Sequence, residues 1–186
     1  MKSSVVTLIL SVVTFSAIAA DSAFDCIITS DRNTYKVGEV PRISVSIINK
    51  STKDVVLVSS LDGSARDRRF PKCRFEVLDA SGKPVTLQIF GCGNLNPLET
   101  KDFVAVQAGQ AFYPGATFDP FPVTTAGNYT IRFCYSTSDH IEDYFGSERD
   151  GLHHKASPEI QRLFEHVPKL DLKSNELKLK FTPKSK

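Results

Sequence analysis

The chain has 186 residues, of which 24% are charged, and its formal net charge is +2 at pH 7. A chain so close to neutral lacks the concentrated excess of Lys and Arg that phosphate recognition needs, which argues against a nucleic-acid partner. After the amino-terminal segment described next, about 165 residues remain, enough for one domain with its own core.

The first 19 residues have the parts of a secretory signal peptide. Lys2 supplies a positive start, residues 5–18 are apolar apart from Ser and Thr, and Ala17-Ile18-Ala19 fits the small-x-small pattern of a cleavage site. The apolar run is shorter than the roughly 20 residues that span a bilayer, which argues against a retained anchor. We therefore expect a secreted or periplasmic protein with no membrane span after cleavage.

All four cysteines, Cys26, Cys73, Cys92 and Cys134, lie beyond this segment. An even number of cysteines in an exported chain, with no C-x-x-C pair, favours two disulfides over free thiols or a metal site. Four cysteines can pair in three ways. Cys73 and Cys92 flank a predicted hairpin and are the favoured local pair, which leaves Cys26 for Cys134.

Strands and turns follow one another in the first part of the mature chain. The pattern predicts strands at 24–30, 41–49 and 55–58, with turns at 35–39 and 49–54 between them. Pro41 suits the first position of a strand, where its missing N–H donor costs least.

The middle of the chain continues this pattern after a charged loop at 62–72. We expect a hairpin with strands at 75–77 and 85–89 around a turn at 79–82, then irregular structure at 91–98 next to Cys92, then short strands at 103–106 and 111–118. Close spacing without a long helix between strands favours a sandwich over a parallel α/β sheet. The predicted fold class is therefore all-β.

The strand at 127–135 carries the clearest alternation. Its apolar side chains are Tyr129, Ile131, Phe133 and Tyr135, and Thr130, Arg132 and Cys134 lie on the opposite face. A turn Gly followed two residues later by Tyr resembles the tyrosine corner of immunoglobulin-like domains, in which the Tyr hydroxyl bonds to the backbone of the preceding turn. Cys134 departs from the antibody pattern, because it lies five residues beyond the Tyr and on the outer face.

A long insertion at 136–171 interrupts the strands. Within it Ser157 can cap a helix that starts at Pro158 and ends before Pro168, with Ile160, Leu163, Phe164 and Val167 on one face. A helix of two or three turns needs packing, so we expect this face to lie on the sandwich; a partner protein is the less favoured occupant.

The last predicted strand contains Leu177, Leu179 and Phe181. Lys178 and Lys180 alternate with them and would face solvent, where they would discourage pairing at an exposed edge. Residues 183–186 form a short basic tail.

Several segments together resemble bacterial exported immunoglobulin-like domains: 35–39, 43–51, 75–85, 127–129 and 174–177. The middle portion is also similar to the bacterial proteinase-inhibitor domain of the same general fold and to β-sandwich propeptides of some secreted metallopeptidases. The resemblance implies an immunoglobulin-like antiparallel β-sandwich over residues 20–182. It consists of turn residues and alternation, which specify a fold but carry over no inhibitory residue.

No catalytic template is present: there is no Gly-x-Ser-x-Gly elbow, no His-Glu-x-x-His helix and no phosphate-binding loop. We therefore expect no enzyme and no cofactor. The favoured hypothesis is a non-catalytic exported binding or structural module whose loops contact a protein partner at the cell envelope or outside the cell. The alternative is an inhibitor or propeptide-like guard of a secreted protease, which would present residues 91–98 beside Cys92.

Two clusters are candidate ligand sites. His140, His153 and His154 lie with several carboxylates in the insertion and could hold zinc, but their spacing matches no ligand motif and a solvated loop is favoured. A basic cluster at 66–74 could receive an oxyanion, although neighbouring acids partly neutralise it. The glycosylation sequons at Asn49 and Asn128 would matter only in a eukaryotic secretory pathway.

Overall fold

A computed structural model of the chain describes residues 23–61, 63–66, 70–86, 98–116, 123–138 and 156–184. The predicted signal peptide at 1–19, Cys92 and residues 139–155 of the insertion lie outside these ranges. Within them, no helix is long and apolar enough to cross a membrane.

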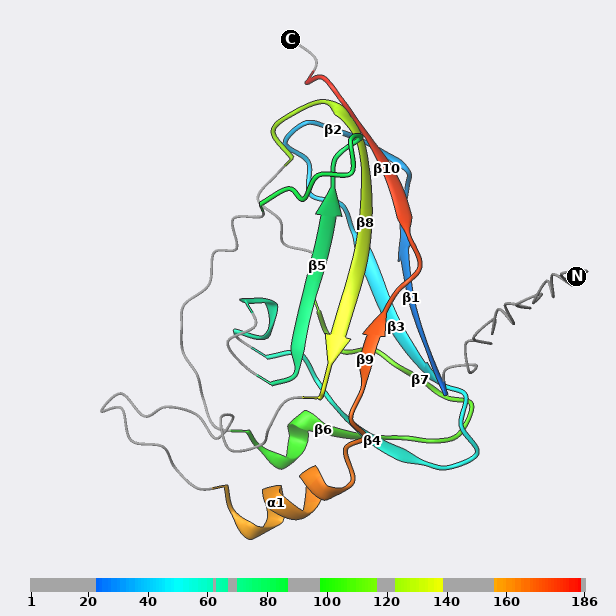
Figure 1. Ribbon diagram of the computed structural model, residues 1–186, viewed down its shortest axis with the longest axis vertical. Coiled ribbons are helices and arrows are strands. Elements are labelled where there is room, and N and C mark those ends of the chain that lie inside the picture. The colour runs from blue at the N-terminus through cyan, green and yellow to red at the C-terminus, as the bar shows by residue number, and fades with distance from the viewer. Residues whose placement is uncertain are drawn as a thin grey trace, which may run out of the picture.

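The described residues form an all-β sandwich with one short α-helix, as predicted. The strands are β1 (Phe24–Ser30), β2 (Thr34–Lys36), β3 (Ile43–Asn49), β4 (Val55–Val58), β5 (Lys72–Leu78), β6 (Phe103–Val106), β7 (Ala111–Phe112), β8 (Gly127–Ser136), β9 (Asp171–Lys173) and β10 (Leu177–Thr182). The helix α1 is Pro158–Glu165, and two short 3-10 helices are Ser64–Arg66 and Thr100–Asp102. Figure 1 shows β5 and β8 side by side along the sandwich and α1 across its lower end.

One layer of the sandwich contains β1, β3 and β7 in that order, together with the β4–β6 pair. Ile47 of β3 lies opposite Phe112 of β7, and Val55 of β4 lies opposite Val106 of β6. β3 and β4 therefore do not pair with each other. They follow one another along the segment that contains β6 and β7, and the predicted turn interrupts this antiparallel pairing. Asn49, which is fully buried, spans the interruption through side-chain N–H bonds to the carbonyls of Lys53 (2.9 Å) and Val106 (3.1 Å).

The other layer has the order β2-β10-β8-β5, and β9 pairs with β8. All its pairs are antiparallel except β2 with β10. Because β2 pairs with β10 at Lys180–Thr182, Lys180 does not lie at an exposed edge, and the prediction of edge protection is wrong for this residue. Lys178 precedes the residues paired with β2, and both lysine side chains are exposed. The sequence predicts only a turn near Tyr35, since the three residues of β2 are too few to show alternation.

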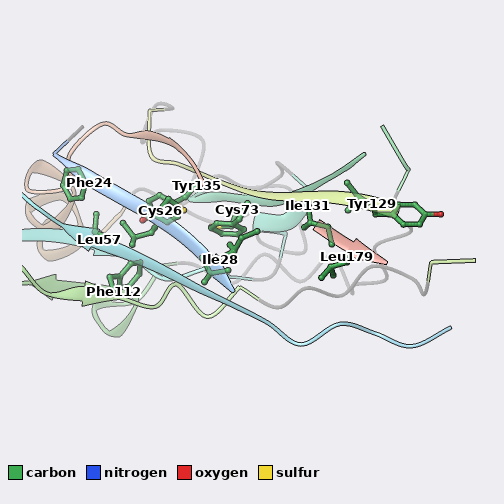
Figure 2. Packing of buried hydrophobic residues seen from close by; sticks show 14 of the residues in the cluster. Phe24, Cys26, Ile28, Leu57, Cys73, Phe112, Tyr129, Ile131, Tyr135 and Leu179 are labelled. Carbon is green, nitrogen blue, oxygen red and sulfur yellow. The ribbon is translucent and has the colours of Figure 1, made fainter. Parts of the chain in front are cut away.

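The core lies between the layers, and β8 contributes its predicted face. Ile131, Phe133 and Tyr135 are fully buried, and Tyr129 is buried beside them. Figure 2 shows Ile131 and Tyr135 among buried residues that include Phe24 and Ile28 of β1. The Tyr129 hydroxyl donates to the carbonyl of Thr125 at 2.9 Å, which confirms the hydrogen bond expected of a tyrosine corner.

Tyr135 joins the two layers through its hydroxyl. This group donates to the carbonyl of Val58 at 3.0 Å and accepts from the N–H of the same residue at 3.1 Å. Val58 and Tyr135 are both completely buried, so the two hydrogen bonds are shielded from water. The last residue of β4 is thereby held to the end of β8.

The helix α1 closes one end of the sandwich, as expected for its apolar face. The Ser157 hydroxyl caps it by accepting from the N–H of Ile160 at 3.2 Å. Ile160 and Phe164 are buried in a second cluster with Val58, Phe70 and Leu98, against which Leu163 and Val167 pack. The ring centre of Phe164 lies 5.0 Å from that of Phe70 and 5.2 Å from that of Phe103. Packing within the protein therefore accounts for the apolar face of α1.

Two predicted strand boundaries differ from those observed, and a third strand is described only in part. β3 begins at Ile43, so Pro41 precedes the strand, and β7 ends at Phe112. The return strand expected at 85–89 is described only at its start, where the N–H of Val85 donates to the carbonyl of Val77 at 2.8 Å and Leu78 bridges to Pro84. Residues 87–89 lie outside the described ranges.

Candidate binding surface on the β2-β10-β8-β5 sheet

The side of the β2-β10-β8-β5 sheet that faces away from the core, here called the outer face, is mostly polar. Its central column consists of the residues of β8 that alternate with the buried ones: Asn128, Thr130, Arg132, Cys134 and Ser136. The register places Lys180 beside Asn128; Lys178 and Leu78 beside Thr130; Glu76 beside Arg132; Lys173 and Arg74 beside Cys134; and Asp171 and Lys72 beside Ser136.

The middle of the outer face is charge-compensated. Arg132 forms an ion pair with Glu176. Glu76 lies 2.7 Å from the ammonium of Lys173 and 3.8 Å from the guanidinium of Arg74. The hydrogen bond from Lys173 lowers the pKa of the Glu76 carboxyl, so this group stays ionised and paired at neutral pH.

Below the middle lies a hollow of about 380 Å³, the lower hollow, with Cys134 at its centre. Burial, followed by the negative charge of Glu76, raises the pKa of the Cys134 thiol to about 11. At neutral pH this thiol is protonated and therefore a poor nucleophile or metal ligand. The nearby Asp171 carboxylate accepts hydrogen bonds from the hydroxyls of Ser136 and Ser138, which lower its pKa. The carboxylates of the lower hollow thus have hydrogen-bond or ion-pair partners within the hollow or beside it.

Above the middle, at the end of the face formed by Asn128 of β8 and Lys180 of β10, lies a hollow of about 590 Å³, the upper hollow. Its lining comes from the ends of β10, β8 and β5 and from the residues around the start of β2: Asn33, Thr34, Leu78, Asp79, Ala80, Gly82, Asn128, Tyr129, Thr130, Arg132, Glu176, Lys178, Leu179 and Lys180. The hydroxyls and amides of this lining offer both hydrogen-bond donors and acceptors.

In the upper hollow, the acidic Asp79 has hydrogen-bond partners within the protein, whereas the basic Lys178 and Lys180 have no acidic partner among the described residues. One oxygen of Asp79 accepts from the N–H of Ser81 (2.8 Å), the hydroxyl of Ser81 (2.6 Å) and the N–H of Lys83 (3.0 Å). These bonds form the β5 turn and lower the pKa of Asp79. Among the described residues, neither Lys178 nor Lys180 has an acidic group within ion-pair distance. Two exposed ammonium groups are thus left for an external ligand.

Of the two predicted cysteine pairs, only Cys26–Cys134 has both members among the described residues, and it is not formed. Cys26 and Cys134 are free thiols in the structure, so the expected bond between them is not made. Cys26 lies among the core residues, whereas the alternation of β8 turns Cys134 to the outer face. Burial and, secondarily, the charge of Cys134 raise the pKa of Cys26 to about 12. Cys73 is buried in the core, and its predicted partner Cys92 lies outside the described residues.

Other predicted sites fare differently. His140, His153 and His154 lie outside the described ranges, and the side chains within those ranges form no group of three His, Cys, Asp or Glu that could hold a metal ion. Residues 67–69 of the basic cluster also lie outside the described ranges. Arg74 of this cluster lies on the outer face next to Glu76. These placements give no support to a metal or oxyanion site.

The two sequons occupy opposite environments. Asn49 is fully buried, its amide N–H groups donate to two backbone carbonyls, and its oxygen accepts from the N–H and hydroxyl of Ser51 at 3.1 and 2.7 Å. The motif at Asn49 therefore has a structural role. Asn128 is exposed and lines the upper hollow.

Sequence reasoning missed the upper hollow because its residues are far apart along the chain. Alternation places Thr130 and Arg132 on one face of β8, and it places Lys178 and Lys180 on one face of β10. Nothing local shows that β2, β10, β8 and β5 are neighbours in that order, which is what brings these residues together.

Comparison with known protein-family models finds no match for this chain, and comparison with curated proteins finds none either. The functional argument therefore depends on the chemistry of the outer face.

Proposed function

We propose that this protein is a non-catalytic, exported binding module that docks a protein partner on the outer face of the β2-β10-β8-β5 sheet. The observation that carries the proposal is the pair Lys178 and Lys180 in the upper hollow. Both are exposed on a face whose other charges are used within the fold. Edge protection does not account for Lys180, because β10 pairs with β2 on one side of this residue and with β8 on the other.

The chemistry of the face supports binding over catalysis. Cys134 is held as a thiol by burial and by Glu76. The carboxylates of Glu76 and Glu176 are used in ion pairs with Lys173 and Arg132. A sheet whose carboxylates are paired and whose Lys178 and Lys180 ammonium groups are exposed is better suited to recognition.

Three features support an immunoglobulin-like sandwich as the scaffold. The first strand region is divided between the layers, since β1 pairs with β3 while β2 runs parallel to β10. β10 and β8 are neighbours although the insertion and β9 separate them along the chain, and β8 and β5 are neighbours although β6 and β7 lie between them in sequence. The hydroxyl of Tyr129 closes a tyrosine corner. Export is proposed from the signal-like residues 1–19.

Site-specific photo-crosslinking tests the proposal. A photoreactive amino acid replaces Asn128, which is exposed on the outer face, and in a matched variant it replaces Ser44, which is exposed on β3 in the other layer. Both variants are produced in the native host and irradiated in intact cells. We expect a discrete cross-linked protein from position 128 and none from position 44.

Two results would contradict the proposal. One is the same set of cross-linked products from both positions, which would indicate random collisions. The other is no product from position 128 when the variant is exported at normal levels.

A further inference from the structure

We infer that the upper hollow binds an extended acidic polypeptide segment, with carboxylates of that segment against Lys178 and Lys180. This inference rests on the proposed function and names the chemistry of the partner. It goes beyond a general docking face, because it specifies the charge and the spacing of the side chains that are recognised.

The spacing comes from strand geometry. Lys178 and Lys180 are alternate residues of β10 and point to the same face, about 7 Å apart at 3.3–3.4 Å per residue. An extended partner segment also repeats its side-chain direction every second residue. Two acidic residues separated by one other residue therefore match the two ammonium groups.

The neighbours of the two lysines suit a peptide. Asn128 lies beside Lys180 and Thr130 lies beside Lys178 in the register. Thr34 lies next to Lys180 on the other side. These amide and hydroxyl groups can donate to and accept from a partner backbone, while the half-buried Leu78 supplies an apolar contact.

The negative charges of the upper hollow do not cancel the two lysines. The Asp79 oxygen that accepts three hydrogen bonds is engaged by its own turn, and Glu176 is paired with Arg132. An added carboxylate therefore meets two uncompensated cations and two acids whose charge is already partly neutralised.

An acidic glycan fits less well. Carbohydrate sites commonly offer an aromatic face, and the one aromatic ring among the described lining residues is that of Tyr129. That ring is only 8% exposed, and its hydroxyl is bonded to Thr125. The lining therefore favours a polypeptide over a sugar polymer.

Binding of a defined peptide to the mature protein tests the inference. The probe is a fluorescein-labelled peptide of alternating Glu and Ser, measured by fluorescence anisotropy. Comparison probes are the Lys–Ser peptide of equal length and a sulfated oligosaccharide. The test variant is Lys178→Glu/Lys180→Glu, and the control is Lys53→Glu/Lys169→Glu, which changes the net charge equally at exposed lysines outside the upper hollow.

We expect the Glu–Ser peptide to bind the unmodified protein and the control alike, and affinity to fall at least about tenfold in the test variant. Added salt should weaken binding by the unmodified protein. If the test variant does not fold, Lys178→Gln/Lys180→Gln takes its place. The inference is overturned by absence of peptide binding, by equal losses in test and control variants, or by tighter binding of the sulfated oligosaccharide.

The two experiments separate the inference from the proposed function. A cross-linked partner at position 128 together with no binding of the Glu–Ser peptide would remove the acidic-segment inference and leave the docking face. Absence of a cross-linked partner would remove the docking face itself.

Discussion

Tyr135→Phe is the sharpest test of the packing described here. The substitution keeps the ring and removes only the hydroxyl that links β8 to β4. In the native structure that hydroxyl serves both polar backbone groups of Val58, at 3.0 and 3.1 Å, and no water reaches the fully buried pair. The variant therefore leaves one N–H and one C=O without the partner they have in the native protein.

The expected cost follows from those two groups. Leaving a buried polar group unsatisfied costs about 1–3 kcal/mol, and part of this is offset because Phe carries no hydroxyl to desolvate. We expect Tyr135→Phe to lower the free energy of unfolding by about 3 kcal/mol, which for a domain of this size corresponds to a fall in Tm of about 9 °C. Urea denaturation followed by circular dichroism measures the first quantity, and calorimetry measures the second.

Two other tyrosines provide matched controls. Tyr129→Phe removes a single hydrogen bond, to Thr125, and should cost about 1 kcal/mol. Tyr113→Phe alters a side chain that is 69% exposed and should change stability by less than about 0.5 kcal/mol. If Tyr135→Phe also stays within about 0.5 kcal/mol of the unmodified protein, the two hydrogen bonds to Val58 do not hold the layers together as described.

Three further predictions concern the second cluster and the outer face. Phe164→Ala should destabilise the protein by about 3 kcal/mol in urea denaturation because it empties the space between Phe70 and Phe103, whereas Glu165→Ala on the exposed side of α1 should have little effect; equal losses would contradict this packing. The pKa of Glu76 is lower in the folded than in the unfolded state, so its carboxylate stabilises the fold above the unfolded pKa, and this stabilisation is lost as pH falls through the folded pKa. Glu76→Gln should therefore reduce the loss of stability between about pH 5 and pH 3 in denaturation series, and an unchanged slope would count against the Lys173 pair. With a pKa of about 11 against an ordinary value of 9.0, the Cys134 thiol should react with iodoacetamide at pH 8 about a hundredfold more slowly than a cysteine peptide, and a comparable rate measured by mass spectrometry would refute its shielding by burial and Glu76.

Local patterns predicted much of the fold. The uninterrupted alternation from Tyr129 to Tyr135 identified the buried face of β8, and the Ser157 cap with Pro158 located the start of α1. Each of these signals is contained within about ten residues, where the geometry of a strand or helix relates sequence spacing directly to direction. The tyrosine corner is of the same kind, because its acceptor is four residues from Tyr129.

Such local patterns do not predict which segments far apart in the sequence pair with each other. Asn49 has the sequence of an ordinary polar turn and sequon, yet it is fully buried where β3 passes to β4, because the carbonyl of Val106 lies there to accept its amide. The sequence likewise places Cys134 on the outer face of its strand, but it does not show that Cys26 faces the core between the layers.

The sequence by itself determined the all-β class, the face of each long strand that is buried and the packing side of α1, because alternation and helical period depend only on neighbouring residues. Only the tertiary structure decided that β10 lies between β2 and β8, that the hydroxyl of Tyr135 joins the layers, and that Lys178 and Lys180 share a hollow with Asn128 and Thr130. Strand order depends on which distant segments bury the most apolar surface together while satisfying their backbone hydrogen bonds. The candidate binding surface is a product of that order.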